Sequence, residues 1–318
     1  MKTLITGGTG FIGSHVVDRL VKNGHEVRLF SRRPELHRRP AGAAVTVVTG
    51  DLREGETVFS AMQGMDVFYH IGEIRNTSRA AAEKNVRLLE GILDHLPGSG
   101  IKRFVFVSSI TVAGIPSSVP GTENTPPAAV LKDHYTWYKQ RCEEMLAAKR
   151  GDGEYAVIRP GVVYGPGSKS LRRMAETVAK LGAVGLPFAG RGDNAAPFVQ
   201  VDDLAEAIFL AGARREAANQ IFNITDGLRH AWSEFFGAIA AATGRKLRII
   251  PLPPLLLRVP AVFADLLSGV FGVTPDLTSY VSYVSRDILF DTAKAKALLG
   301  WEPAHTDLAA GVREMMGK

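Results

Sequence analysis

Tyr135 and Lys139 stand four residues apart in Tyr135–Lys149, a stretch that the sequence predicts to be helical. Side chains at this spacing lie on the same face of a helix. A free phenol titrates near pH 10, so acid–base chemistry at pH 7 requires help of about 3 pH units, roughly 4 kcal/mol. An ammonium about 4 Å away supplies attraction of that order at an effective dielectric of about 20. The pair predicts a proton-transferring tyrosine, although the same spacing also arises by chance on many helices.

A pair of serines ends the apolar stretch Phe104–Ser108, which predicts a buried strand and is followed directly by Ser109. A hydroxyl at this place can hold a substrate oxygen against the phenol of Tyr135. The alternative is that the serines only terminate the strand. Tyr138 is the competing phenol, but four residues further on it meets Cys142 rather than a cation.

A glycine-rich turn near the start of the chain predicts the scaffold for these side chains. Lys2–Thr6 predicts a strand, and it leads through Gly7, Gly10 and Gly13 into the amphipathic run Phe11–Asn23. Gly7 permits the tight turn, Gly10 lets the backbone approach phosphates, and Gly13 lets helix and strand pack closely. The first-turn N–H groups and the positive helix end then face the anion. We expect a dinucleotide pyrophosphate here; the alternative is an ordinary turn with incidental glycines.

Strands alternate with helices through the first half of the chain, a pattern typical of a parallel sheet covered on both faces. The fold class is therefore α/β, a Rossmann doubly wound sheet. An eight-fold barrel is the alternative, but its phosphate loops come late in the chain. The expected strands are Lys2–Thr6, Glu26–Phe30, Val45–Thr49, Val67–His70, Phe104–Ser108 and Tyr155–Arg159, with helices at Phe11–Asn23, Gly55–Gln63, Ala80–Leu96 and Tyr135–Lys149.

The second half is less regular. After Gly165, loops with Gly and Pro flank one helix, Phe198–Val201 predicts a short strand, and the residues from Leu228 are mostly helical. We expect a nucleotide-binding domain over 1–165, to which 197–225 returns. A smaller, mostly helical substrate-binding lobe then comprises 166–196 and 226–318. It closes a cleft over the carboxyl edge of the sheet, where ligands of open α/β sheets bind.

Composition and charge narrow the class of protein. The chain has 318 residues, 46% of them hydrophobic and 22% charged, which is typical of a globular protein. Its net charge is +6 and its pI about 9.4, but the cations form no long basic stripe, so we expect no nucleic-acid partner. The densest cluster follows the second strand and suits a cofactor phosphate: Arg28, Arg32, Arg33, Arg38 and Arg39.

The cysteine and histidine contents point to a reduced, metal-free protein. A single cysteine, Cys142, excludes an intramolecular disulfide and fits a reducing compartment, so we expect a cytoplasmic location. The strand predicted at Lys2 leaves no room for a secretory leader. The eight histidines have no paired ligand spacing, so no metal site is expected.

The most apolar segment, Pro251–Gly272, contains Arg258, Asp265 and several prolines, which makes it a poor membrane span. A position in a membrane interface stays open. Its apolar residues recur at helical spacing, as expected of a helix packed on the body or over a pocket. They are Leu255, Val259, Val262, Leu266 and Val270.

Taken together, the motifs resemble those of the extended short-chain dehydrogenase/reductase family, in that family's order and over nearly the whole chain. They are Thr6–Gly13 (TGGTGFIG), Asp51-Leu52, Asn85-Val86, Ser108-Ser109, Tyr135 with Lys139, Arg159–Gly167 (RPGVVYGPG), Phe198–Asp203 (FVQVDD) and Phe290–Pro303 (FDTAKAKALLGWEP). The resemblance implies a Rossmann domain, a nicotinamide cofactor and a catalytic site of Ser109, Tyr135 and Lys139. Tyr135 would be the acid/base, Lys139 would lower its pKa and hold the nicotinamide ribose, and Ser109 would orient the substrate oxygen.

The resemblance also implies the residues that contact the cofactor, with Asp51 and Leu52 flanking the adenine. NAD-preferring members usually carry an acidic residue at the end of the second strand, whereas this chain has Ser31 followed by Arg32 and Arg33. Guanidinium groups bind a 2′-phosphate that a carboxylate would repel, so we expect NADP(H), with NAD(H) the alternative. The full expected set is Gly7, Gly10, Phe11, Ile12, Gly13, Ser31, Arg32, Arg33, Asp51, Leu52, His70, Ile71, Gly72, Asn85, Ser108, Tyr135, Lys139, Pro160, Val162 and Val163.

The chain departs from the nucleotide-sugar epimerases of that family. Those enzymes bind a diphosphate through an Asn and an Arg side chain. At the matching positions this chain has Val162 and Ala196. The stretches Gly190–Asp203 and Tyr280–Pro303 instead resemble the 3β-hydroxysteroid dehydrogenase and dihydroflavonol reductase branches. We therefore expect an oxidoreductase acting on a lipophilic or polycyclic secondary alcohol or ketone, and the resemblance implies a homodimer. A nucleotide-sugar epimerase/dehydratase and a non-catalytic NADP(H)-binding scaffold are the alternatives.

Overall fold

A seven-stranded parallel sheet forms the centre of the computed structural model, which describes residues 1–33, 44–74, 78–149, 153–181, 184–258, 260–262 and 277–318. The strand order is β13-β8-β5-β4-β1-β2-β3, so the chain reverses direction across the sheet between β1 and β4. The strands are β1 (Lys2–Thr6), β2 (Glu26–Ser31), β3 (Val45–Thr49), β4 (Val67–His70), β5 (Arg103–Val107), β8 (Glu154–Pro160) and β13 (Gln220–Ile224).

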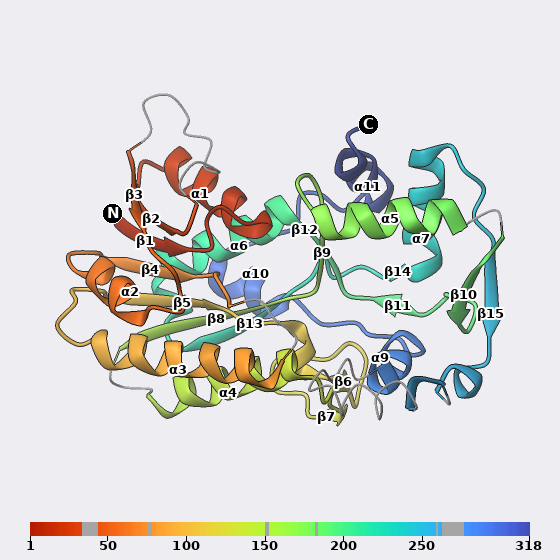
Figure 1. Ribbon diagram of the computed structural model, residues 1–318, viewed down its shortest axis with the longest axis horizontal. Coiled ribbons are helices and arrows are strands. Elements are labelled where there is room, and N and C mark those ends of the chain that lie inside the picture. Colours follow the sequence, from red (N-terminus) through yellow and green to blue (C-terminus); the bar gives the residue numbers. More distant parts are fainter. Residues whose placement is uncertain (34–43, 75–77, 150–152, 182–183, 259, 263–276) are drawn as a thin grey trace.

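Helices cover both faces of this sheet (Figure 1). One face carries α1 (Phe11–Lys22), α6 (Val201–Ala213) and α10 (Ala293–Leu299); the other carries α2 (Gly55–Met62), α3 (Arg79–His95) and α4 (His134–Ala148). Successive strand residues serve opposite faces, as Leu4 and Ile5 do, and both are fully buried. The doubly wound α/β fold predicted from the sequence is confirmed.

The six predicted strands of the sheet agree with the structure to within one residue at each end. The seventh, β13, was not predicted as a strand. It is short, pairs only with β8 at the edge of the sheet, and carries the polar residues Gln220 and Asn223. Its pairing depends on contact with a strand more than sixty residues earlier, which local patterning does not reveal.

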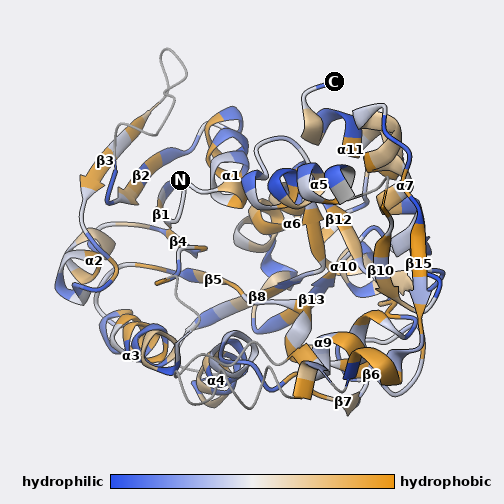
Figure 2. Cartoon of the chain, turned by 45° about the vertical axis from the view of Figure 1, so that its right-hand side comes forward, coloured by the Kyte–Doolittle hydropathy of each residue, from blue (hydrophilic) through white to orange (hydrophobic). Residues whose placement is uncertain are grey.

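Beyond β8 the chain builds a second body of short strands and helices. The strands form three pairs: β9 (Val162–Tyr164) with β12 (Phe198–Gln200), β10 (Leu186–Ala189) with β15 (Ile249–Leu252), and β11 (Ala195–Ala196) with β14 (His230–Ala231). The helices are α5 (Lys169–Leu181), α7 (Trp232–Thr243), α9 (Leu277–Val284) and α11 (Leu308–Met316). In Figure 2 β15 and α9 are predominantly orange, whereas α5 shows a largely blue face.

A separate core holds this body together. Phe198 stacks on Phe235 with ring centroids 5.0 Å apart, and Val312 of α11 packs into the same cluster. The end of the chain also returns to the sheet: Trp301 is 1% exposed and donates its indole N–H to the Asp203 carbonyl at 2.8 Å. The domain ranges expected from the sequence stay a prediction.

The apolar segment around residue 257 is helical at 254–258 and 260–262. The expectation that Leu255 and Val262 pack on the body is wrong, because they are 70% and 44% exposed. Leu257 and Ala261 face inward instead. The expected positions Val259, Leu266 and Val270 lie outside the described residues. In the part of the chain that is described, no helix has the length and apolar character needed to cross a membrane.

Candidate active site

The catalytic helix α4 begins at a side-chain cap that fixes the position of Tyr135. Asp133 accepts hydrogen bonds from the backbone N–H and the hydroxyl of Thr136, both at 2.8 Å. Such a cap satisfies a donor that the first turn leaves without an intrahelical partner. Tyr135 therefore stands in a stabilised first turn, and its side chain is 39% exposed, so the ring is accessible from one side.

Lys139 lies one turn further on, at the buried face of α4. It is 4% exposed and donates from Nζ to the Val107 carbonyl at the end of β5, at 2.7 Å. The same ammonium is 5.8 Å from the ring centre of Tyr135. Burial lowers the pKa of Lys139, and the carboxylate of Glu73 opposes that shift. The predicted Tyr135–Lys139 pair is thus assembled next to a strand end.

Ser109 completes the predicted set of catalytic side chains. It lies two residues beyond the end of β5 and caps the short 3-10 helix η2 (Ile110–Ala113); its Oγ also accepts from the Thr111 hydroxyl at 3.0 Å. Its hydroxyl also lies close enough to the Tyr135 phenol to favour the ionised form, which lowers the pKa of that phenol. Loss of hydration and the nearby Glu73 charge are larger effects and raise the pKa of Tyr135. The phenol therefore keeps its proton near neutral pH. The lowering of its pKa by Lys139 stays a prediction.

The competing phenol, Tyr138, is engaged elsewhere. It is 5% exposed, and its hydroxyl donates to the Glu73 carboxylate at 2.5 Å. Burial and the Glu73 charge raise its pKa well above the ordinary value, so it remains protonated. Tyr135 is therefore the more accessible of the two phenols. Glu73, which the sequence reasoning missed, follows β4 in the chain and meets α4 only through the fold.

Ser108 has a structural partner. Its hydroxyl donates to Glu143 of α4 at 2.5 Å, and Glu143 also receives Arg159 of β8 in a bidentate pair whose shortest N–O distance is 2.6 Å. Both charged side chains are nearly buried, at 6% and 11% exposure. This network ties α4 to the ends of β5 and β8 and so fixes the height of Tyr135 and Lys139 above the sheet.

The glycine-rich turn has the shape that a pyrophosphate requires. Gly7 has a φ of +76°, and a Cβ there would approach the backbone nitrogen of Gly72 to 2.6 Å. A Cβ at Gly13 would lie 2.1 Å from the Gly7 carbonyl oxygen. Gly10 is the N-cap of α1 and offers no side-chain cap, and no acidic residue stands in the first turn. The helix end is thus open to an anion, and Phe11 and Ile12 form its first turn.

At the end of β2, the predicted phosphate-binding residues stand side by side. Ser31 is buried and accepts the Arg33 backbone N–H at 3.1 Å, whereas Arg32 and Arg33 are exposed. Arg32 is 3.8 Å from the Asp51 carboxylate, which Arg53 also holds at 2.5 Å. The hydrogen bond from Arg53 lowers the pKa of Asp51. Asp51 is therefore already part of an ion-pair network next to the Arg32 guanidinium.

Two of the other expected cofactor residues have protein partners. His70 is 5% exposed, bonds through Nδ1 to the Thr6 hydroxyl at 2.8 Å, and burial lowers its pKa to about 3, so it is neutral. The Asn85 amide accepts from Ile74 N–H at 2.8 Å and donates to the Ile74 and Ala81 carbonyls, which fixes the loop after β4.

The remaining expected cofactor residues lie at the carboxyl ends of parallel strands, which meet along one edge of the sheet. Ile71 and Gly72 follow β4, and Leu52 follows β3 and lies close to Gly72. Pro160 ends β8, with Val162 and Val163 in β9 directly after it.

Among the described residues no group of three histidines, cysteines or carboxylates is placed to hold a metal ion.

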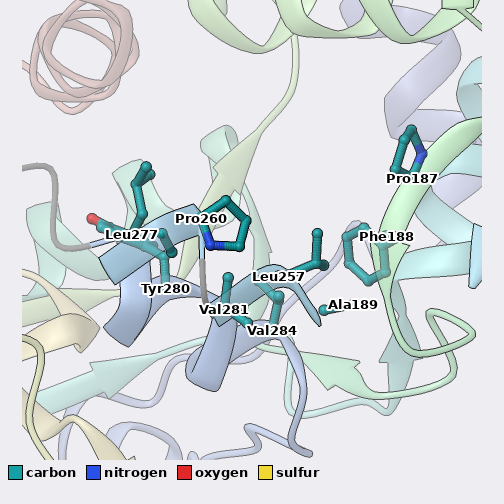
Figure 3. Close-up of a pocket in the computed structure, with 10 residues that line it drawn as sticks. Pro187, Phe188, Ala189, Leu257, Pro260, Leu277, Tyr280, Val281 and Val284 are labelled. Atoms are coloured by element: carbon teal, nitrogen blue, oxygen red, sulfur yellow. The ribbon is translucent and has the colours of Figure 1, made fainter. Parts of the chain in front are cut away.

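An apolar pocket of about 460 Å³ lies between β10, the helical stretch near residue 257 and α9. As Figure 3 shows, α9 contributes Leu277, Tyr280, Val281 and Val284, and β10 contributes Phe188 and neighbouring residues from the opposite side. Tyr280 lies close enough to Tyr135 to act on the electrostatic environment of its phenol. One residue of the pocket lining therefore belongs to the surroundings of the Tyr135 phenol.

A family model described as the NAD dependent epimerase/dehydratase family matches residues 3–225. The chain belongs to this family. It is an NAD(P)-dependent enzyme of the extended short-chain dehydrogenase/reductase type, as the sequence motifs predicted.

Curated relatives point to two chemistries within the family. The chain is 29% identical to a 3-beta-hydroxysteroid dehydrogenase of Mycolicibacterium neoaurum, over 96% of this chain and 88% of that protein. It is 27% identical to a UDP-glucose 4-epimerase of Vibrio cholerae, over 95% of this chain and 91% of that one.

Solved structures have the same fold. The crystal structure of gox2253 superposes with a TM-score of 0.81 at 24% identity, covering 99% of this chain and 96% of that one. MoeE5 in complex with UDP-glucuronic acid and NAD superposes with a TM-score of 0.74 at 22% identity, covering 100% of this chain and 98% of that one.

Proposed function

We propose that this protein is an NADP(H)-dependent oxidoreductase that interconverts a lipophilic secondary alcohol and its ketone. The observation that carries the proposal is the position of the Tyr135 phenol, near the Ser109 hydroxyl and near Tyr280 of the apolar pocket lining. When bound, the nicotinamide supplies the hydride donor or acceptor.

The protein residues handle the substrate oxygen and its proton. In the direction of reduction, Ser109 holds the carbonyl oxygen and Tyr135 donates the proton that the new hydroxyl requires. Burial raises the pKa of the Tyr135 phenol and so favours its protonated form, which is the form needed for this direction. Lys139 would bind the nicotinamide ribose and bring its positive charge to the phenolate that remains.

The lining of the pocket supports an apolar substrate. Its volume of about 460 Å³ falls within the range of small-molecule sites, and its walls are Pro, Ala, Leu, Val, Phe and Tyr. Val162 and the buried Ala196 occupy the positions at which diphosphate binding would need Asn and Arg. A diphosphate there would lack the hydrogen bonds that those two side chains would donate.

Preference for NADP(H) follows from the end of β2. Arg32 and Arg33 are exposed next to the buried Ser31 hydroxyl, with no carboxylate in the sequence at those three positions. We expect NADPH to bind at least tenfold more tightly than NADH, a difference of about 1.4 kcal/mol. Replacing both arginines with alanine removes this preference, and a fluorescence titration with each nucleotide measures it.

The experiment that tests the activity follows reduced nicotinamide absorbance while NADPH is mixed with a panel of lipophilic ketones. The proposal predicts a fall in absorbance that matches the alcohol formed, mole for mole. UDP-glucose serves as the parallel substrate. Epimerisation of UDP-glucose with steady absorbance would establish the alternative, since an epimerase regenerates its cofactor in each cycle.

A non-catalytic scaffold is the alternative from another class, and it would bind NADPH without turning over any substrate in the panel. We also propose that the protein acts as a homodimer in the cytoplasm. Light scattering of the purified protein gives the mass of the assembly, and fractionation of cells gives the location.

A further inference from the structure

Glu73 brings a second charge to the catalytic site. Glu73 follows Gly72 in the loop after β4. This loop lies at the side of β1 where the order of the strands in the sheet reverses. Cofactors of doubly wound sheets bind across this point. Glu73 is partly exposed, and it is fixed toward α4 by the 2.5 Å hydrogen bond from Tyr138.

The charged and titratable groups described around Glu73 come from three elements, α4, β4 and β8. From α4, Lys139 carries a positive charge at 5.0 Å from the Tyr138 ring centre, and Tyr135 stands edge-on to Tyr138 with centroids 5.5 Å apart. From β4, His70 is neutral. On the far side of Lys139, Glu143 is already paired with Arg159. Among the described residues, Glu73 is therefore a second carboxylate whose charge acts on Lys139, besides Glu143.

An oxidised nicotinamide ring is a cation, whereas the reduced ring is neutral. Lys139 alone would place a second positive charge next to that cation and weaken binding of the oxidised cofactor. A carboxylate at the same edge strengthens binding of the oxidised cofactor. The size of this effect depends on the charge of the carboxylate and not on the hydrogen bond that the carboxylate accepts.

We propose that Glu73, through the charge of its carboxylate, makes the site bind NADP⁺ more tightly relative to NADPH and so makes the bound NADPH a stronger hydride donor. This inference rests on the NADP(H)-dependent function proposed above. It concerns relative affinity for two redox forms, which can be measured without any substrate.

The test compares dissociation constants for NADP⁺ and NADPH in the full-length wild type, Glu73→Gln and Tyr138→Phe. Glu73→Gln is expected to raise the ratio of the NADP⁺ constant to the NADPH constant by about fivefold or more, the effect of one screened charge. Tyr138→Phe removes the hydrogen bond but keeps the carboxylate, so its ratio is expected to stay within about twofold of wild type.

Glu73→Asp provides a second variant that retains the charge, with the same expected ratio as Tyr138→Phe. Equal changes in Glu73→Gln and Tyr138→Phe, or a ratio shifted in Glu73→Asp as well, would show that Glu73 only anchors Tyr138. An unchanged ratio in Glu73→Gln would also overturn the inference while leaving the proposed function intact. Binding of neither nucleotide to the wild type would overturn both.

Discussion

Two walls contribute to the proposed site and are built in opposite ways. The polar wall consists of Ser109, Tyr135 and Lys139, and it comes from one strand end and one helix that are tied by Glu143 and Arg159. The apolar wall is the lining of the 460 Å³ pocket, and it comes from β10, the helical stretch near 257 and α9. Ser109 and Lys139 of the polar wall are 8% and 4% exposed, whereas Tyr135, like Leu277 and Tyr280 of the apolar wall, is about 40% exposed.

This difference indicates how the proposed function divides proton transfer and substrate binding between the two walls. Rigid hydrogen-bonded groups on the sheet edge suit a proton transfer that tolerates little displacement. Apolar contacts are less directional, so the same polar wall can serve different substrates when the apolar wall changes. Variants in one wall should therefore alter turnover, and variants in the other should alter substrate affinity.

The largest effect is expected from Tyr135→Phe. Loss of the proton donor should lower kcat by about 10²–10⁴-fold, the usual contribution of general acid–base catalysis. Tyr138→Phe is the matched control, because its phenol is occupied by Glu73, and its kcat should stay within about tenfold of wild type. Turnover near wild type in Tyr135→Phe would remove Tyr135 from the chemistry.

The buried Glu143–Arg159 pair, which holds α4 against the sheet, should contribute strongly to the stability of the protein. Glu143→Ala leaves Arg159 buried without its partner, and we expect a loss of about 3–5 kcal/mol in the free energy of unfolding. The neighbouring Glu144→Ala removes an exposed pair with Arg141 and should change it by about 1 kcal/mol or less. Urea unfolding measures both, and equal losses would contradict the assigned role of the network.

The apolar wall should govern affinity. Val281→Asp puts a carboxylate into the pocket lining, and we expect KM for an apolar ketone to rise by about tenfold or more with kcat nearly unchanged. Leu255→Asp is the control, because Leu255 is 70% exposed and is not among the residues that line the pocket. A fall in kcat with unchanged KM in Val281→Asp would contradict the division between the walls.

The smallest effect is expected at Asp226, outside both walls. Burial raises the pKa of this carboxyl from 3.8 to about 6. Between these two values the folded protein holds a proton that the unfolded chain has lost, so stability falls as the pH rises through this window. Asp226→Asn keeps an oxygen for the Leu228 N–H and removes this loss.

At about pH 8 we expect the Asp226→Asn protein to be more stable than wild type by on the order of 1–2 kcal/mol. The gain should shrink as the pH falls toward about 4. The exposed Asp193→Asn is the control, and thermal unfolding across this pH range measures both. A gain that is the same at every pH would contradict the assigned titration.

The sequence predicted the polar wall because its information is local. Alternating strands and helices predicted the sheet, the four-residue spacing put Tyr135 and Lys139 on one helix, and Ser109 lies two residues beyond its strand. Glu73 was missed because its contact with Tyr138 joins residues 65 positions apart, with no repeating pattern to reveal it.

The apolar wall was predicted only as an apolar segment. Which residues face the pocket depends on how β10 and α9, about ninety residues apart in sequence, come together. Helical spacing favoured Leu255 and Val262, but Leu257 and Ala261 line the pocket. The prolines at 254 and 260 lie in this stretch, and neither periodicity nor composition specifies which side of so short a helix meets the body.

The central claim is that the polar wall performs the chemistry and the apolar wall binds the substrate. The most direct measurement is single-turnover reduction of a lipophilic ketone by NADPH-loaded Tyr135→Phe, together with the affinity of that ketone for the same loaded variant. The account predicts wild-type affinity with hydride transfer slowed by at least about 10²-fold. Lost affinity with normal hydride transfer at saturating ketone would contradict it.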